Sequence, residues 1–211
     1  MRVIVLLLLV VTAYGCAIKA PMVASPTGDG KYWVLKEPLE YEHPETKEKV
    51  IAPRGFVTDL ASVPRLFWTA FPPCGKYTSA AVIHDYLYWV QPTSCDRKCA
   101  DDILLTAMEE SNVNFVTRNA IDRAVRAGGQ SSWDGNLRAR LEGAIRQIHE
   151  EFLNFEPNDT WEQIERRIRA ASKRTGELPK LASVSSVLPN KHLHLTASSI
   201  RSCLAPAFGS R

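Results

Sequence analysis

Four polar residues in the middle of the chain combine an imidazole with three carboxylates. Asp59 follows a short β-branched segment, and His84 and Asp85 are neighbours in an apolar helical pattern. Asp101 lies near the start of the next helical pattern. Because short connections place consecutive elements side by side, we expect these side chains to converge. An imidazole oriented by a carboxylate can act as a general base, and an imidazole with two carboxylates can hold a divalent metal ion that activates water.

The sequence therefore offers His84, Asp85, Asp59 and Asp101 as catalytic candidates, and His84, Asp59 and Asp101 as metal ligands, with the identity of any metal unspecified. A structural alternative stays open. Asp59 can cap a helix, His84 can be a core histidine bonded to a backbone carbonyl, and Asp101 can pair with a neighbouring base. On this alternative the protein is not an enzyme.

The elements that must position these residues form an α+β pattern. Segments 32–35, 39–41, 49–52 and 55–58 have the short β-branched and aromatic character of strands. Helical patterns follow from Pro64, from Thr78 to about Val90, from Asp96 to about Glu110, and from Phe115 to Arg126, where Gly128-Gly129 is expected to end the helix. An amphipathic helix is expected from Leu137 to Phe152, and a last one after Asp159-Thr160.

These patterns predict a small antiparallel sheet (about 32–58) packed against helices (about 64–127), then a helical C-terminal extension and a disordered tail. As domains, we expect a signal peptide at 1–15, a mobile tether at 16–31, the α+β domain at 32–133, the helical extension at 134–175 and the tail at 176–211.

The first residues indicate export. Met1-Arg2 supplies a positive start, Val3–Val11 is an unbroken apolar run, and small residues precede Cys16. Ala13-Tyr14-Gly15-Cys16 resembles a bacterial lipobox, although Ala13 stands where Leu is commonest, so ordinary cleavage after Gly15 is the alternative. We expect a cell-envelope protein held to the membrane by lipid on Cys16.

Charge argues against nucleic acid as a partner. The chain carries 26 basic residues and a formal net charge of +3. Arg2 and the four basic residues after Pro179 lie outside the main body of the chain, from Cys16 to Pro179. This leaves 21 basic and 23 acidic residues between Cys16 and Pro179. A near-neutral body lacks the electrostatic footprint of a nucleic-acid-binding protein.

The cysteines fit an oxidising compartment. With Cys16 lipidated, Cys74 can bridge to Cys95 or to Cys99, which would staple two helix starts together. Zinc bound by Cys74, His84, Cys95 and Cys99 is an alternative, although paired short Cys-x-x-Cys spacings on both sides are missing.

The stretch from Gly55 to Trp133 carries a family resemblance. Thr58-Asp59-Leu60-Ala61-Ser62-Val63-Pro64, His84-Asp85-Tyr86-Leu87-Tyr88 and Val125-Arg126-Ala127-Gly128-Gly129 are its main blocks. Together they resemble the phage- and prophage-associated domain of unknown function 1353 family, over about 32–133. The resemblance implies no reaction, because the family has none assigned.

Two hypotheses about function follow. The first is a His/Asp-centred hydrolase, metal-assisted in one form, that acts on a cell-wall or other envelope polymer. The second is a non-catalytic envelope or phage-derived binding or assembly module, in which the same residues lock the fold. The sequence specifies neither the substrate nor the oligomeric state.

Overall fold

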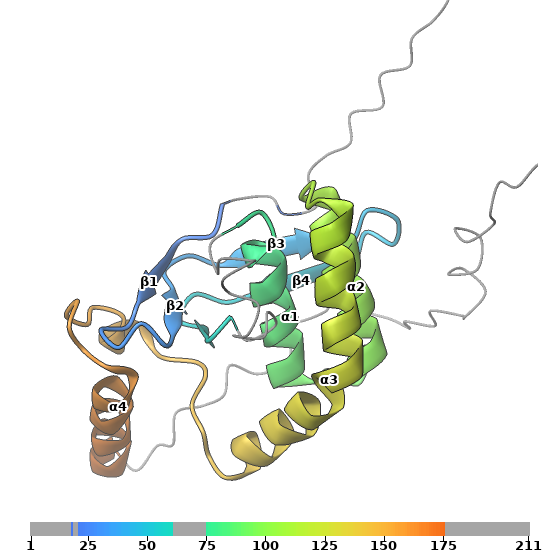
Figure 1. Cartoon of the computed structure of the whole chain (residues 1–211). Helices are drawn as coiled ribbons and strands as arrows, with labels where there is room; N and C mark the ends of the chain where they lie inside the picture. Colours follow the sequence, from blue (N-terminus) through green and yellow to red (C-terminus); the bar gives the residue numbers. More distant parts are fainter. Residues whose placement is uncertain (1–17, 19–20, 61–74, 176–211) are drawn as a thin grey trace, which may run out of the picture.

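The computed structural model describes residues 18, 21–60 and 75–175 (Figure 1). The expected signal peptide, Cys16, the helix expected from Pro64, Cys74 and the expected tail therefore lie outside the described residues. The rest is α+β, as the sequence predicts: short antiparallel strands come first and helices follow.

Within the described residues, five strands form two antiparallel sheets. Their bounds are β1 Ala24–Pro26, β2 Trp33–Leu35, β3 Leu39–Glu42, β4 Lys49–Ala52 and β5 Val57–Thr58. One sheet has the order β1-β2-β5, and the other is the β3-β4 pair. The strands expected at 32–58 are confirmed, with small shifts at their ends. β1 was not expected, because it lies within the segment taken for a mobile tether, where its backbone pairs with β2.

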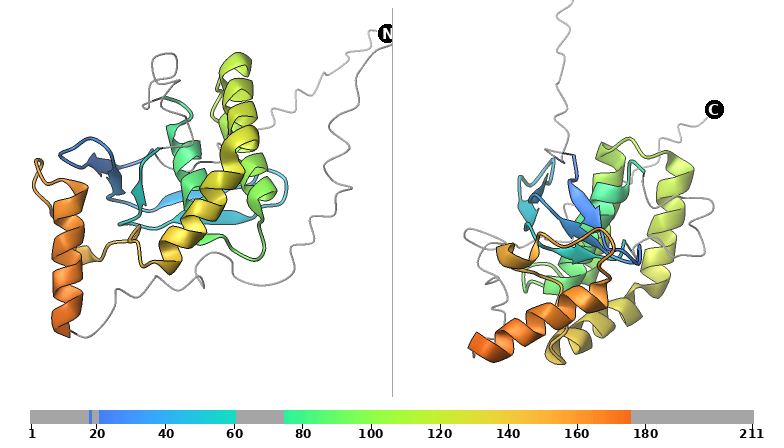
Figure 2. Two further views of the ribbon diagram at one scale, coloured as in Figure 1. Left: turned by 60° about the horizontal axis from the view of Figure 1, so that its bottom comes forward. Right: turned by 90° about the vertical axis from the view of Figure 1, so that its left-hand side faces the viewer.

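Helices α1 (Thr78–Val90), α2 (Arg97–Glu110) and α3 (Phe115–Leu141) pack against one another beside the sheets (Figures 1 and 2). The starts of α1 and α2 agree with the sequence. Asp96 caps α2 by accepting a hydrogen bond from the Cys99 amide at 2.8 Å, and Asn114 caps α3 in the same way. Apolar residues of all three helices share one core with β3 and β4.

The prediction that α3 ends at Gly128-Gly129 is wrong, since the helix continues to Leu141. Gly129 is buried against α1, and a Cβ atom there would lie 2.4 Å from the Tyr88 hydroxyl oxygen. This glycine therefore serves close packing of two helices rather than a helix end. The helix is followed instead by Gly143, whose φ of +81° suits glycine.

The helix expected from Leu137 to Phe152 is also wrong, because only its first residues belong to α3. After Gly143 the chain is extended: the Val57 amide donates to the Arg146 carbonyl at 2.8 Å, and the Ile148 amide donates to the Gly55 carbonyl at 3.0 Å. A 3₁₀ turn follows at Glu150–Phe152. Beyond α3, the apolar residues that gave a helical period, Ile145, Ile148 and Phe152, instead pack in one cluster with residues of the sheet, so tertiary pairing overrides the local pattern.

The β1-β2-β5 sheet lies between two apolar clusters. Leu35 and Phe56 belong to the cluster that includes α1, whereas their neighbours Val34 and Val57 belong to a second one. This alternation is the ordinary two-faced character of a strand. The second cluster is completed by residues of the extended segment and by α4 (Trp161–Thr175), the helix expected after Asp159-Thr160. These are Ile148, Leu153, Ile164 and Ile168.

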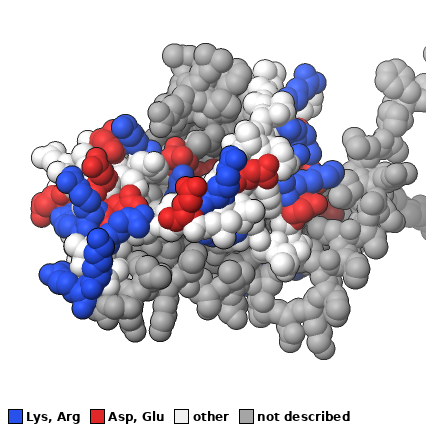
Figure 3. All heavy atoms as spheres, turned by 90° about the horizontal axis from the view of Figure 1, so that it is seen from below, with Lys and Arg blue, Asp and Glu red and all other residues white. Residues whose placement is uncertain are grey.

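Charged side chains of both signs are interleaved on the face seen in Figure 3. Many are paired within α4 or between α2 and α3, such as Arg169 with Glu165 at 2.5 Å and Arg126 with Asp102 at 2.8 Å. Over the described ranges, no helix has the length and apolar character needed to cross a membrane.

Candidate functional site

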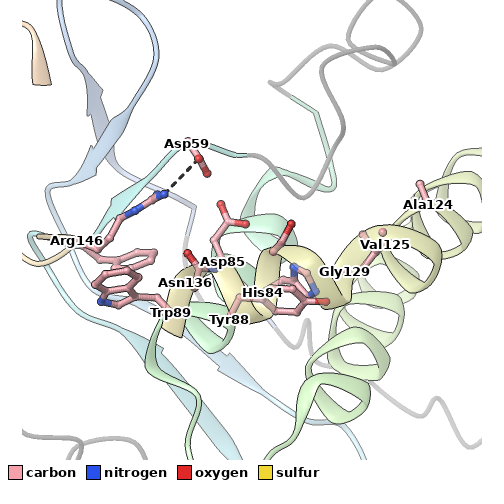
Figure 4. Close-up of a pocket in the computed structure, with 14 residues that line it drawn as sticks. Asp59, His84, Asp85, Tyr88, Trp89, Ala124, Val125, Gly129, Asn136 and Arg146 are labelled. Carbon is pink, nitrogen blue, oxygen red and sulfur yellow. Dashed lines mark hydrogen bonds and ion pairs between the residues drawn. The ribbon is translucent and has the colours of Figure 1, made fainter. Parts of the chain in front are cut away.

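A cavity of about 490 Å³ lies between α1, the second half of α3 and the chain around β5 (Figure 4). Asp59, His84 and Asp85, which the sequence singled out, all line it. Asp101 does not line the cavity but contacts His84 from behind. The predicted convergence in space is therefore found for these four residues, while their roles stay predictions.

His84 is a buried polar residue of the cavity wall, with 2% of its surface exposed. Its Nε2 atom lies 3.1 Å from Oδ1 of Asp101, which is also 2% exposed. His84 comes from the middle of α1 and Asp101 from the second turn of α2, so packing of these two helices brings the pair together. The arrangement fixes the imidazole ring with a carboxylate.

The Asp101 carboxylate is the centre of a buried network. The Tyr88 hydroxyl donates to Oδ1 at 2.6 Å, and Nη1 of Arg97 donates to Oδ2 at 2.7 Å. Burial alone would raise the pKa of Asp101, but the hydrogen bonds from His84 and Tyr88, followed by electrostatic attraction to His84 and Arg97, outweigh it and hold the pKa below its usual value. Asp101 is thus ionised at neutral pH and accepts from the Nε2–H of His84.

The phenol of Tyr88 is in the protonation state that complements the ionised carboxylate of Asp101. Burial, followed by the hydrogen bond to Asp101 and its charge, raises the pKa of the phenol. It therefore stays protonated and acts as a donor. Its ring lies 4.1 Å from that of His84, centroid to centroid, and meets Trp133 edge-on at 5.1 Å. The imidazole is consequently held on one side by an aromatic ring and at Nε2 by a carboxylate.

Asp85 is held from β5. The Thr58 hydroxyl donates to Oδ2 of Asp85, and the same hydroxyl oxygen accepts from the Leu60 amide at 3.0 Å. Leu60 has a φ of 52°, an unusual value for leucine, directly after Asp59. Thr58 therefore links the end of the sheet to α1 and helps set where the Asp59 turn meets the cavity.

Arg146 was missed by the sequence analysis. Its Nη2 atom lies 3.3 Å from Oδ2 of Asp59, as the dashed line in Figure 4 shows. Its guanidinium carbon lies 5.5 Å from the Tyr32 ring centroid and 5.9 Å from that of Trp89. No local signal indicates this role, because Asp59 is 87 residues away and Arg146 was assigned to a helix.

The α3 side of the cavity carries small residues, which the sequence analysis also missed. Gly128, Ser132 and Gly135 line it at helical spacing, together with Gly129 and Asn136. A signal was present, since positions 128, 132 and 135 share one helix face, but it is visible only once the helix is known to continue. Without side chains at two of these positions, the helix leaves space in front of His84 and Asp85.

The expected metal site is not formed by the residues proposed for it. Asp59 pairs with Arg146, while Asp101 is enclosed by Tyr88, Arg97 and His84. Throughout residues 18, 21–60 and 75–175, no group of three or more His, Cys, Asp or Glu side chains could hold a metal ion. The donor set thus does not fit a metal centre built on His84, Asp59 and Asp101.

The cysteines give a further correction. Cys95 is bonded to Cys99, so neither sulfur can form the expected bridge to Cys74. The bond joins the residue before the Asp96 cap to the first turn of α2, where their Cα atoms are 5.3 Å apart. It also removes two thiolates from the alternative zinc site.

In chemical terms, the cavity combines a carboxylate-supported imidazole, a second carboxylate and a guanidinium. Such a set can accept a proton from water or a hydroxyl group and can offset negative charge that develops on a bound molecule. Aromatic side chains of Phe56, Tyr88 and Trp89 supply part of the wall.

No curated protein and no solved structure matches the chain. A family model does, and the residues that it matches, 33–125, run from β2 into α3 and include Asp59, His84, Asp85 and Asp101. By this match, residues 33–125 are similar to the family described as Protein of unknown function (DUF1353), whereas the cavity-lining residues from Gly128 to Arg146 lie outside the matched range.

Proposed function

We propose that the protein is a hydrolase of the cell envelope and that the cavity beside His84 is its active site. One observation carries the proposal: a buried histidine, bound at Nε2 by the ionised carboxylate of Asp101, lines a cavity of about 490 Å³ that it shares with Asp85 and Arg146. This volume lies in the range of small-molecule and substrate sites.

His84 is the general base in this scheme. In the tautomer that donates Nε2–H to Asp101, a neutral imidazole carries its lone pair on Nδ1. As the oxygen of a water molecule bonds to the scissile carbon, its proton passes to His84, and the imidazolium that forms is stabilised by Asp101. The bond between that carbon and the leaving group then breaks as the same proton passes from His84 to the leaving group, which returns the imidazole to its neutral form.

Arg146 supplies positive charge where the substrate gains negative charge. The guanidinium is partly buried and is kept in place by Asp59 and by the Tyr32 and Trp89 rings. A cation fixed before the reaction needs little rearrangement during it. Asp85, held by Thr58, is the polar group that orients the bound substrate or the water.

The expected location in the cell envelope indicates the substrate class. Residues 1–16 resemble an export signal that ends in a cysteine suited to lipidation, which supports a protein that works among envelope polymers. Aromatic walls beside polar groups suit glycan and peptide chains. The competing view, a phage-derived binding or assembly module, draws on the Asp101 network, since a buried network can also serve only to lock a fold.

The experiment compares the purified full-length chain with its His84→Gln variant on insoluble peptidoglycan and on its soluble glycan and peptide fragments. His149 is exposed, so His149→Gln is a matched control. Released products are measured by chromatography and mass spectrometry. We expect turnover by wild type and by His149→Gln, and a loss of about 100-fold or more in His84→Gln, as for removal of a general base.

Because His84 is buried, the melting of each variant is followed by circular dichroism. Asp85→Asn serves as a second cavity variant if His84→Gln does not fold. Wild type that releases no product from any of these polymers, or a folded His84→Gln with full turnover, would overturn the hydrolase and leave the binding module.

A further inference from the structure

The turn that joins α2 to α3 exposes two adjacent apolar side chains. Phe115 is 69% exposed and Val116 is 73% exposed, at the very start of α3. The Arg118 guanidinium carbon lies 5.5 Å from the Phe115 ring centroid, and the same guanidinium pairs with Glu109 at 3.1 Å. An aromatic ring beside a branched aliphatic group, both exposed on one helix end, is typical of a surface that rests in a lipid interface.

The start of the described chain lies beside this corner. Ile18 makes a β-bridge with Tyr41 of β3. Tyr41 in turn is buried in the same apolar cluster as Met108 near the end of α2 and Val113 in the connection to α3. The charge of Glu110, after burial, also raises the pKa of the Tyr41 phenol. The α2–α3 corner lies at the top of Figure 1. Ile18 is only two residues after Cys16, the cysteine expected to carry lipid.

We infer that the Phe115–Val116 corner rests on the phospholipid bilayer that holds the Cys16 lipid, which leaves the cavity facing away from the membrane. The inference rests on the proposed location in the cell envelope but does not require the protein to be an enzyme. A short anchor at Ile18 allows the chain little freedom, so the surface nearest the anchor is the one that meets the headgroups.

The distance along α3 from the apolar corner to the cavity indicates how far the cavity lies from the membrane. Gly128 and Asn136 line the cavity, 12 and 20 residues after Val116. At 1.5 Å per residue, these positions are roughly 18–30 Å along the helix from the apolar corner. A polymer lying above the membrane surface would therefore reach His84 without entering the lipid.

A second exposed apolar pair makes a control available. Leu137 and Leu141 are 39% and 78% exposed at the opposite end of the same helix. They lie beyond the cavity rather than beside Ile18, so we expect them to face water. Exposure alone does not distinguish the two pairs, but the position of the anchor does.

The test places one tryptophan at each end of α3 in the lipidated full-length chain, as Phe115→Trp and Leu141→Trp. Each variant is bound to phosphatidylcholine vesicles whose acyl chains are brominated near the headgroup, and the fluorescence lost to bromine is compared with unbrominated vesicles. The five native tryptophans are common to both variants and to wild type.

We expect the fluorescence added by Phe115→Trp to fall about twofold or more, because interfacial side chains lie about 5–10 Å into the headgroup region. That added by Leu141→Trp should not change. Equal quenching at both ends, stronger quenching at Leu141→Trp, or failure of wild type to float with vesicles would overturn the inference. So would sedimentation showing a dimer that Phe115→Asp dissociates, because the corner would then cover a second copy. None of these readouts depends on turnover, so this inference and the proposed hydrolase fail separately.

Discussion

At the scale of single residues, the site depends on one ionised carboxylate. Asp101 accepts from His84, Tyr88 and Arg97, and it is almost fully buried. It therefore couples the orientation of the imidazole to the stability of the helical core. Removing it should affect both.

Asp101→Asn should lower the free energy of unfolding by about 3 kcal/mol at pH 7, because a buried partner of Arg97 loses its charge. Asp102→Asn is the matched control. Its carboxylate is 32% exposed and pairs with Lys98 and Arg126, so that loss should be roughly 1 kcal/mol or less. Urea unfolding of the three proteins measures both values, and similar losses for the two variants would contradict the account.

The difference in unfolding free energy between wild type and Asp101→Asn should depend on pH. The pKa of Asp101 is lower in the folded protein than its ordinary value, so its contribution to stability is present above that value and is lost as pH falls through the folded pKa. The gap between wild type and Asp101→Asn should be constant above about pH 5 and should narrow below about pH 4. A gap that stays unchanged down to strongly acidic pH would show that the charge of Asp101 is not what stabilises the fold.

Part of the site could be predicted from residue types. Asp59, His84 and Asp85 follow one another through short connections, and such neighbours do meet at one cavity. Arg146 could not be predicted in this way, because its place depends on backbone pairing between β5 and a segment about 90 residues later. The enclosure of Asp101, which argues against a metal ligand there, likewise depends on side chains from two helices.

At the scale of elements, α3 decides the shape of the site. Arg140 donates from Nη1 to the carbonyls of Trp89 and Val90, each at 2.6 Å, and Gln91 donates to the Trp133 carbonyl at 2.7 Å. These bonds tie the second half of α3 to the end of α1. Two neighbouring glycines mark a helix end in many sequences, whereas here the close contact with Tyr88 explains why position 129, inside a continuing helix, is a glycine.

This explanation predicts opposite effects for two neighbouring substitutions. Gly129→Ala should destabilise the protein by about 1–3 kcal/mol, since the new methyl group would meet the Tyr88 hydroxyl. Gly128→Ala meets nothing within 4 Å and should stabilise the helix by about 0.5–1 kcal/mol. Urea unfolding of wild type and both variants measures these changes in unfolding free energy. If both variants were stabilised, Gly129 would not be a packing residue.

At the scale of the whole molecule, the cavity lies where two parts of the fold meet. The β1-β2-β5 sheet carries one apolar cluster with α1 and another with α4 and the extended segment. The sequence predicts the α+β class well, because strands and helices differ clearly in period. It predicts less well how the last third of the chain returns to the sheet, since Ile145 and Ile148 fit a helical period as well as an extended edge.

The central claim is that the cavity is where a substrate binds. Gly135→Leu tests it most directly, because this position lines the cavity and has nothing within 4 Å of a Cβ atom. Ala127→Leu adds a leucine to an exposed position of the same helix that does not line the cavity, and serves as control. The measurement is the release of soluble fragments from peptidoglycan by wild type and both variants. The account predicts that Gly135→Leu stays folded and loses turnover while Ala127→Leu retains it; equal turnover in all three would contradict it.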